Sequence, residues 1–338
     1  MSGFKARLQT RKDTYTIDYP HLIELARQQA NLIWFAEESG VEKDEQDVRV
    51  KLTDGERHGL QTVLKLFTKY ELMLGGDEFW GGKINRMFPR PEVQRLSATN
   101  SYVELGIHAP FYDLINKTLN INTDEFYDSW KEEKVLRDRI EAIASYAESD
   151  DPFRVTASFA FMEGVVLFSN FAFLKSFSTN GLIPHVVAGI DASAKDENYH
   201  SVASASLFRI LCSEYEQAGE QPPGGHEQLA SDVIEVARTT YEHEAQIVDL
   251  IFEKGGIRGI TKEEILCFVR NRIDVVLGYL GYSPLFGDED GVVSKWFYNQ
   301  ISTFKHSDFF NATQFQYTRN IAVHELFFRT DLALEYPL

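Results

Sequence analysis

Cysteine is scarce in this chain of 338 residues: only Cys212 and Cys267 are present, and both lie within apolar stretches. Two such cysteines argue against a disulfide framework and fit a reducing compartment, so we expect a cytoplasmic protein. An excess of basic residues is also lacking, since 51 acidic residues against 34 basic ones leave a formal net charge of −17. This balance argues against a nucleic-acid partner, because phosphate binding needs a basic surface.

Long apolar runs are lacking as well, with one exception. Val155–Leu174 contains a single charged residue, Glu163, and is long enough to span a bilayer. It also contains Ser158, Ser169 and Asn170, and no second stretch resembles it. We therefore interpret it as a helix buried on all sides within a large helical protein, and expect no membrane association. The polar N-terminus argues against a secretory signal.

Helical periodicity dominates the rest of the chain, and no alternating pattern requires a sheet. One helix is expected to begin directly after Thr53 or Asp54, and either of these two residues can cap it. Further helices are expected at roughly His21–Glu38, Pro91–Leu119, Thr123–Tyr146, Asp151–Phe177, Pro184–Gln217, His226–Phe252 and Thr261–Leu280. We expect an all-α protein with a single helical domain over residues 1–317, followed by a C-terminal tail over residues 318–338.

The strongest local pattern is a glutamate followed three residues later by a histidine, Glu197 and His200. On a helix these side chains share a face, and such a pair is the recurring half-site of dinuclear carboxylate proteins in helical bundles. Taken alone, the pair is more often part of a solvated helix face, because this spacing occurs frequently by chance. Glu163 in its apolar helix is costly to bury unless it binds a metal or pairs with a cation such as lysine.

Two further helices carry the same residue types. Glu104 and His108 lie four residues apart, and Glu71 follows Leu64 and Phe67 at the spacing of one apolar helix face. Together, four helices supply four inward carboxylates and two histidines, which is the set that a dinuclear site in a four-helix bundle requires. Carboxylate and imidazole ligands suit iron or manganese.

With these residues identified, the sequence resembles the small, radical-generating subunit of class I ribonucleotide reductase. The resemblance covers most of the chain and implies a ferritin-like helical bundle with the dinuclear site in its core. Its motifs are W-F-A-E-E at residues 34–38, D-G-E-R-H at residues 54–58, and S-D-F-F at residues 307–310 before Tyr317. The step from Glu163 to Glu197, and an aspartate before the second of them, also suit the family.

The resemblance implies a set of metal ligands. One metal would be held by Glu71, Glu104 and His108 and the other by Glu163, Glu197 and His200, with one or two carboxylates bridging. The centre would contain two iron ions, with a manganese–iron or a dimanganese pair as alternatives.

The resemblance also implies redox roles. Tyr112, one turn after His108, would be oxidised to a stable radical in a pocket lined by Phe171, although by itself it could be an ordinary core tyrosine. Trp34, Asp196 and His108 would form a hydrogen-bonded path for an electron, and Trp34 alone could be a core aromatic. Tyr317 would pass the radical to the large subunit, where the tail docks.

Two features depart from the family pattern. The usual first pair is Glu-x-x-His, whereas Glu104 and His108 are four apart. Pro110 has no N–H to give to the carbonyl of Gly106, so the helix must be distorted there, and a π turn is a common way to shift register at a functional site. Glu71 stands where aspartate is commoner, which leaves open the metals and whether they, rather than Tyr112, store the oxidising equivalent.

The implied function is the reduction of ribonucleoside di- or triphosphates to deoxyribonucleotides, by a homodimer that is active only with a large subunit. The alternative is a stand-alone ferritin-like dimetal oxidase acting on a small molecule or lipid, which would need neither Tyr317 nor the tail. A third hypothesis is a metal-storage or purely structural helical protein.

Overall fold

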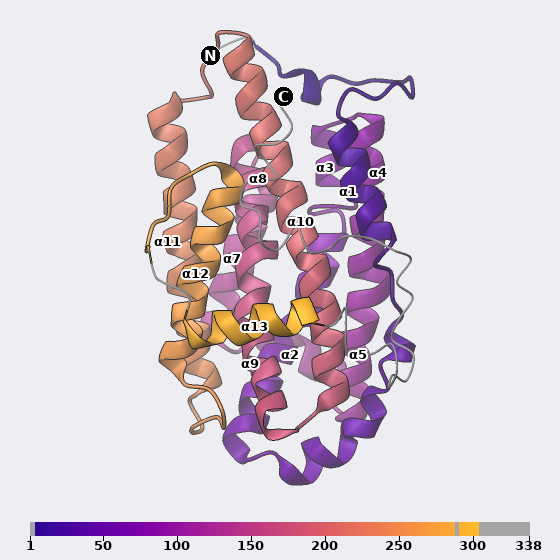
Figure 1. The fold of residues 1–338 in the computed structure, drawn as a ribbon, viewed down its shortest axis with the longest axis vertical. Coiled ribbons are helices and arrows are strands. Elements are labelled where there is room, and N and C mark those ends of the chain that lie inside the picture. The colour runs from indigo at the N-terminus through magenta and orange to yellow at the C-terminus, as the bar shows by residue number, and fades with distance from the viewer. Residues whose placement is uncertain (1–3, 288–290, 304–338) are drawn as a thin grey trace.

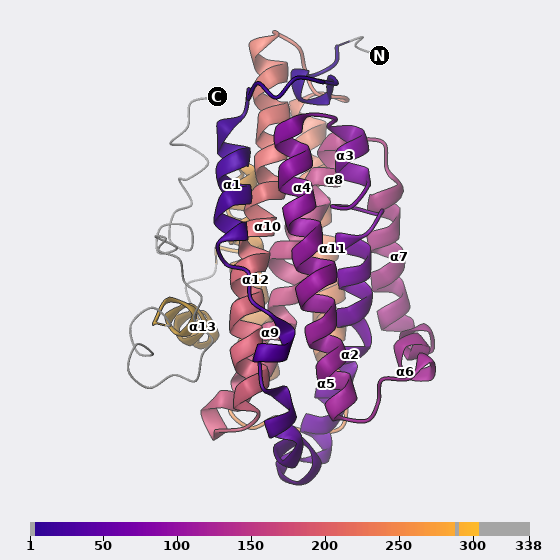
Figure 2. The same ribbon diagram turned by 90° about the vertical axis from the view of Figure 1, so that its right-hand side faces the viewer.

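The computed structural model describes residues 4–287 and 291–303. Regular structure in these residues is helical, and only an isolated bridge between Ile257 and Ile260 pairs extended backbone there. The long helices lie side by side along the longest axis of the molecule, and α13 (Val292–Thr303) crosses them (Figures 1 and 2). The predicted all-α class is confirmed.

The bundle is built from long helices joined by short helical turns. Its helices are α1 (Pro20–Ala30), α2 (Asp54–Gly75), α4 (Pro91–Val103), α5 (Ala109–Thr118), α7 (Lys134–Glu148), α8 (Pro152–Phe161), α9 (Leu167–Ser176), α10 (Pro184–Gln217), α11 (His226–Ile251) and α12 (Lys262–Leu280), with the short α3 (Lys83–Met87) and α6 (Asp124–Asp128) between them. Thr53 begins α2 as predicted, because its hydroxyl accepts from the Glu56 N–H while the Glu56 carboxylate accepts from the Thr53 N–H.

Two expected helices are shorter than predicted. The helix expected at His21–Glu38 ends at Ala30, and Trp34 lies in an irregular segment before a short 3₁₀ turn. In this position the Trp34 indole donates a hydrogen bond to Asp196 of α10. The helix expected at Thr123–Tyr146 is interrupted between α6 and α7, where the Ser129 hydroxyl donates to a backbone carbonyl and competes with the helical ladder. Helix α13 was not expected from the periodicity.

Two of the long helical stretches contain a π turn. Glu104–His108 joins α4 to α5, and Met162–Val166 joins α8 to α9. The first is the distortion predicted from Pro110, whereas the second was not predicted. A π turn inserts a residue into the helix and so changes which later side chains face the bundle interior.

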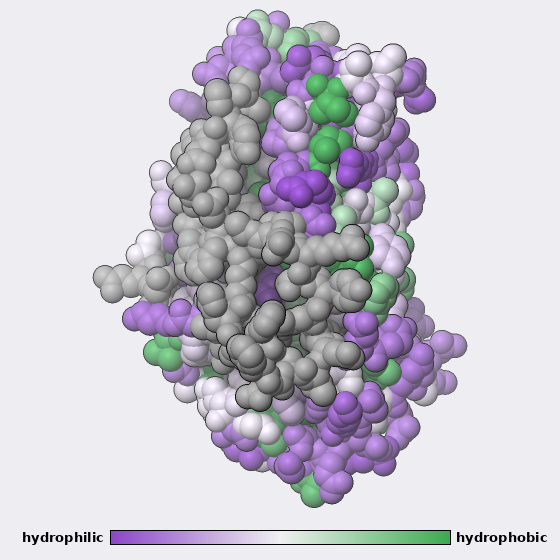
Figure 3. All heavy atoms as spheres, turned by 45° about the vertical axis from the view of Figure 1, so that its right-hand side comes forward, coloured by the Kyte–Doolittle hydropathy of each residue, from purple (hydrophilic) through white to green (hydrophobic). Residues whose placement is uncertain are grey.

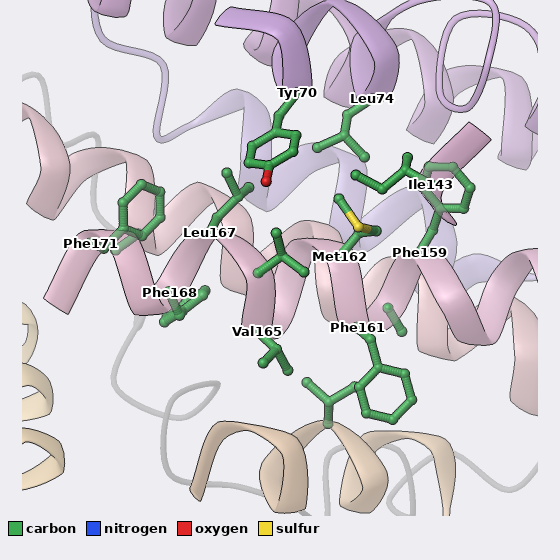
Figure 4. Close-up of a cluster of buried hydrophobic side chains, with 14 of the residues drawn as sticks. Tyr70, Leu74, Ile143, Phe159, Phe161, Met162, Val165, Leu167, Phe168 and Phe171 are labelled. Carbon is green, nitrogen blue, oxygen red and sulfur yellow. The ribbon is translucent and has the colours of Figure 1, made fainter. Parts of the chain in front are cut away.

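The apolar stretch Pro152–Asn180 is long and apolar enough to cross a membrane, but its most apolar window is 100% buried inside the protein. Figure 4 shows Phe159, Met162 and Leu167 of this stretch packed among side chains that include Tyr70 of α2. The stretch is therefore the central core element, as expected. The surface described in Figure 3 is mostly hydrophilic, with scattered apolar side chains.

Candidate metal centre

Four helical segments converge on one buried cluster of carboxylates and imidazoles. All six predicted ligand residues are 0% exposed, and they are Glu71 from α2, Glu104 and His108 from the first π turn, Glu163 from the second π turn, and Glu197 and His200 from α10. The fold thus brings together residues that are separated by more than a hundred positions in the sequence.

The ligand atoms form two overlapping groups, and within each group they lie within 4.8 Å of one another. The first group is Glu71, Glu104, His108 and Glu197, and the second is Glu104, Glu163, Glu197 and His200. Two carboxylates, Glu104 and Glu197, belong to both groups. They stand between two possible ion positions, as bridging ligands would.

Both histidines direct Nδ1 into the cluster. His108 Nδ1 lies 2.9 Å from Glu197 Oε1, 3.0 Å from Glu104 Oε2 and 3.7 Å from Glu71 Oε2. His200 Nδ1 lies 2.5 Å from Glu104 Oε1 and 3.2 Å from Glu197 Oε2. The π turn lets Glu104 and His108 reach one point although they are four residues apart, because its hydrogen bonds span five residues instead of four.

The cluster has fewer hydrogen-bond donors than its carboxylates need. Both carboxylate oxygens of Glu71 and Oε2 of Glu163 have no hydrogen-bond partner among the described residues. Burial raises the pKa of both carboxyls well above its ordinary value, and the neighbouring carboxylates of Glu104 and Glu197 raise it further. Two divalent cations would satisfy these oxygens and displace the protons, so the residues fit a dinuclear metal centre.

The pKa values of the two imidazoles are also raised, although burial acts on them in the opposite direction. Burial acts to lower the pKa of His200, but the nearby Glu104 carboxylate outweighs burial and raises the pKa to about 9. The pKa of His108 is raised well above its ordinary value by Glu197 and Asp196, again against the effect of burial. Without a metal these histidines act as the cations of the cluster, and a metal must displace a proton to bind them.

A hydrogen-bonded chain leads from the cluster toward the surface. His108 Nε2 lies 3.1 Å from Asp196 Oδ2, and Trp34 Nε1 donates to the same oxygen at 2.9 Å. The three residues that were predicted to form an electron path are therefore in contact. Gln29 was not predicted, yet its amide donates to Asp196 Oδ1 at 2.8 Å. The sequence feature that could have identified Gln29 is its position on the apolar face of α1, where a polar side chain needs a buried partner.

Tyr112 lies in an apolar pocket. Its hydroxyl is buried without a hydrogen-bond partner among the described residues, and burial, reinforced by the Glu71 carboxylate, raises its pKa. The Tyr112 ring centroid lies 4.4 Å from that of Phe67, which in turn lies 5.7 Å from that of Phe171. Phe171 thus belongs to the aromatic shell around Tyr112, one ring removed from it.

One ligand contact was missed entirely. The fully buried indole of Trp80 donates to Glu163 Oε1 at 2.7 Å and so orients a predicted ligand. A buried indole N–H needs an acceptor, but no local pattern links positions 80 and 163. Tyr317, the S-D-F-F motif and the tail lie outside the described residues.

Comparisons with known proteins decide the family. The family model described as "Ribonucleotide reductase, small chain" matches residues 11–293. The chain belongs to this family. The resemblance inferred from the motifs is confirmed, and with it the function of a class I ribonucleotide reductase small subunit, an oxidoreductase component. The stand-alone oxidase is not favoured.

Several curated and solved small subunits are similar over most of their length. A probable ribonucleoside-diphosphate reductase small subunit of Invertebrate iridescent virus 3 is 23% identical, over 93% of this chain and 86% of its own. The small subunit of Dictyostelium discoideum is 23% identical, over 92% and 88%. The R2 subunit of Clostridium botulinum superposes with a TM-score of 0.73 at 22% identity, over 85% and 89%. A protein of Streptococcus sanguinis described as dimanganese(II)-NrdF gives 0.69 at 19% identity, over 82% and 95%.

Proposed function

We propose that this ribonucleotide reductase small subunit holds a dinuclear metal centre in the two overlapping ligand groups and uses it to generate the oxidising equivalent for a large catalytic subunit. The sharing of Glu104 and Glu197 by both groups is the observation that carries the proposal. When bound, the metal pair would supply, together with dioxygen or a reduced oxygen species as co-reactant, an oxidant strong enough to oxidise a phenol. The protein contributes the ligands, the apolar shell and the paths for electrons and protons.

Two iron ions are the proposed metals, with manganese–iron and dimanganese pairs as the alternatives. The donor set supports iron or manganese at either position, because it consists of carboxylate oxygens and imidazole nitrogens without thiolate, and two irons are what the resemblance to the family implies. Glu71, in the place of a commoner aspartate, is the ligand through which the metal preference would be altered. Metal analysis of the purified protein together with electron paramagnetic resonance (EPR) distinguishes the pairs.

The redox roles follow from the contacts around the centre. Tyr112 would hold the radical, since its dry aromatic pocket excludes reductants and water. Trp34, Asp196 and His108 would conduct an electron, because they form one continuous hydrogen-bonded chain. Tyr317 would pass the radical on to the large subunit.

The decisive experiment is nucleotide reduction by the metal-loaded protein mixed with its large subunit. Glu197→Ala should abolish the activity and at least one bound metal, because it removes a ligand common to both groups. Glu216→Ala, at an exposed position on the same helix, is the matched control and should behave as wild type. Full activity of Glu197→Ala would overturn the assignment.

We propose the tail at residues 318–338 as the docking segment for the large subunit, after a single helical domain over residues 1–317. Deleting the residues after Asn311 should abolish nucleotide reduction while leaving two metals bound. Retained reduction would refute docking by the tail. A stand-alone oxidase would keep its activity without these residues, so the same deletion discriminates between the two functions.

We also propose a cytoplasmic homodimer. Three exposed apolar side chains support the dimer: Leu72, Tyr102 and Leu105 are 56%, 48% and 41% exposed. They lie on closely packed segments, because an added Cβ at Gly75 would overlap Leu105 and one at Gly106 would overlap Tyr102. Leu105→Lys should shift the mass measured by light scattering toward a monomer. Val50→Lys, at another exposed apolar residue, should leave it unchanged. An unaltered mass for Leu105→Lys would exclude this surface.

A further inference from the structure

Arg272 of α12 is only 1% exposed, and its guanidinium has three hydrogen-bond partners. Nε donates to the Gly164 carbonyl at 2.8 Å, Nη1 to the Tyr298 hydroxyl at 3.1 Å, and Nη2 to Asn198 Oδ1 at 3.4 Å. All three of these partners, and thus all that Arg272 has within the described part of the chain, are neutral. A buried arginine is ordinarily paired with a carboxylate, so this arrangement calls for another explanation.

Two of the partners directly follow predicted metal ligands. Gly164 comes after Glu163 within the second π turn, and Asn198 comes after Glu197 in α10. A π turn interrupts the regular ladder of backbone hydrogen bonds, so carbonyl groups near it need donors from elsewhere. Arg272 supplies such a donor and at the same time ties the two ligand-bearing segments to each other.

The packing around Gly164 fixes this contact. A Cβ on Gly164 would overlap the Ser201 hydroxyl of α10 and the Val276 side chain of α12, so only glycine permits the close approach of the three segments. The Arg272 guanidinium carbon also lies 3.9 Å from the ring centroid of Phe168, one turn beyond Gly164. Two contacts, with the Gly164 carbonyl and with the Phe168 ring, therefore hold the guanidinium against this helical stretch.

A second residue of α12, the helix that carries Arg272, also bonds to Asn198. The Tyr279 hydroxyl donates to Asn198 Oδ1 at 3.1 Å. The amide oxygen thus accepts from both Arg272 and Tyr279 and cannot rotate without losing both bonds. This limits the rotation of α10 at the position next to Glu197.

We propose that Arg272 is a positioning residue of the metal centre, which sets the placement of Glu163 and Glu197 by clamping the residues that follow them. The effect should be greatest for the ion held by the second ligand group, because that group contains both Glu163 and Glu197. The inference rests on the proposed dinuclear site and adds a residue outside the ligand set.

The test is a manganese(II) titration of the metal-free full-length protein, in which EPR reports the free ion and the line shape of the bound pair. Arg272→Gln removes the charge, and Arg272→Lys keeps it but lacks the planar fork that serves three partners. Arg139→Gln is the matched control. Arg139 is a buried arginine of the same bundle that donates to Glu244 and to the Thr240 carbonyl, and to no residue that follows a predicted ligand.

Both Arg272 variants should bind the weaker manganese ion about 10-fold less tightly than wild type. This is the low end of the loss caused by removing a direct partner of a metal ligand, because Arg272 acts through the residues next to the ligands. Their bound-pair EPR line shape should also change, while Arg139→Gln should lose thermal stability with both metal readouts unaltered. If Arg272→Gln does not fold, Arg272→Lys decides.

Unaltered affinity and line shape in the folded Arg272 variants would overturn the inference and leave Arg272 a purely structural residue. The failure of the proposed function gives a different result, because the wild-type protein itself would then fail to bind two manganese ions per chain.

Discussion

Replacing Asp196 by asparagine probes the connection between the metal centre and the protein around it. The carboxylate accepts three hydrogen bonds in the core: from Gln29 at Oδ1, and from Trp34 and His108 at Oδ2. The bond to His108 Nε2 leaves Nδ1 to face the ligand cluster and fixes the orientation of the ring. An asparagine oxygen can still accept from Trp34 and His108. Its amide must then donate to Gln29, whose Oε1 has no partner among the described residues and can turn to accept.

The size of the effect follows from these contacts. Three bonds to a charged acceptor become three bonds to a neutral one, and the difference is about 1 kcal/mol for each, or about 3 kcal/mol of unfolding free energy in total. The shape of the site is kept, so the protein should fold. The neutral acceptor polarises His108 less, and loss of an outer-shell carboxylate typically weakens metal binding about 10- to 100-fold.

The assay combines chemical denaturation of the metal-free protein with a manganese(II) titration. Trp34→Phe is the matched variant, because it removes one donor to Asp196 but leaves the bond to His108. It should bind metal as wild type does and should slow only the delivery of electrons to the oxidised centre. Wild-type metal affinity in Asp196→Asn, or an equal loss of affinity in both variants, would refute this reasoning.

Three further outcomes are expected. Tyr112→Phe removes a hydroxyl without a partner among the described residues, so stability should change by less than about 1 kcal/mol while any tyrosyl EPR signal disappears; a persistent signal would exclude Tyr112. The pKa of His200 is raised to about 9 in the metal-free protein, so its stabilisation is complete below pH ~6.5 and is lost as the pH rises through 9. Thermal unfolding should show the melting temperature of the metal-free protein falling across that range, and a flat profile would contradict the assigned charge. Gly189→Ala would overlap the Phe111 ring and should cost about 1–3 kcal/mol in denaturant unfolding, so unchanged stability would show that the helices can separate there.

Most of the predicted ligands could be brought to one cluster from the sequence because they lie on helix faces defined by local spacing, whereas Glu163 was selected as the one charged residue of an apolar stretch. Glu197 and His200 are three apart, and Glu71 continues an apolar face, so the 3.6-residue period alone selects these side chains. The pair of Glu104 and His108 needed one further step. Pro110 removes a backbone donor, and from that single fact a distorted turn could be predicted at the right place.

The contacts that support the ligands could not be predicted, because they join positions far apart in the chain. Trp80 donates to Glu163, and Arg272 donates to the carbonyl of Gly164, across 83 and 108 residues respectively. Helical periodicity indicates that such residues are buried, but it does not indicate which acceptor they reach. Trp34 shows that long-range contacts can also make a local prediction wrong. The sequence pattern there predicts a helix, but the hydrogen bond to Asp196 accompanies an irregular segment.

The second π turn was hidden for a different reason. The first lies in a helix with a polar face, where a shift in spacing between a carboxylate and a histidine is visible in the sequence. Met162–Val166 lies in a stretch that is buried on every side, so an inserted residue moves one apolar side chain into the place of another. Only Glu163 marks the register there, and a single polar residue cannot reveal a change in period.

The two π turns suggest why the ligands and the fold depend on each other. Each turn contains a predicted ligand: Glu104 begins the first, and Glu163 is the second residue of the other. An extra residue rotates everything that follows by about 100° about the helix axis, so the ligand and the later apolar residues could not all face inward on a regular helix. The interrupted ladder is a local cost, and the Arg272 guanidinium donates to one carbonyl of the second turn, that of Gly164. The bundle therefore contains two irregular turns at the depth where four carboxylates converge. Without a metal, little would offset the free-energy cost of these turns and of the buried carboxylates.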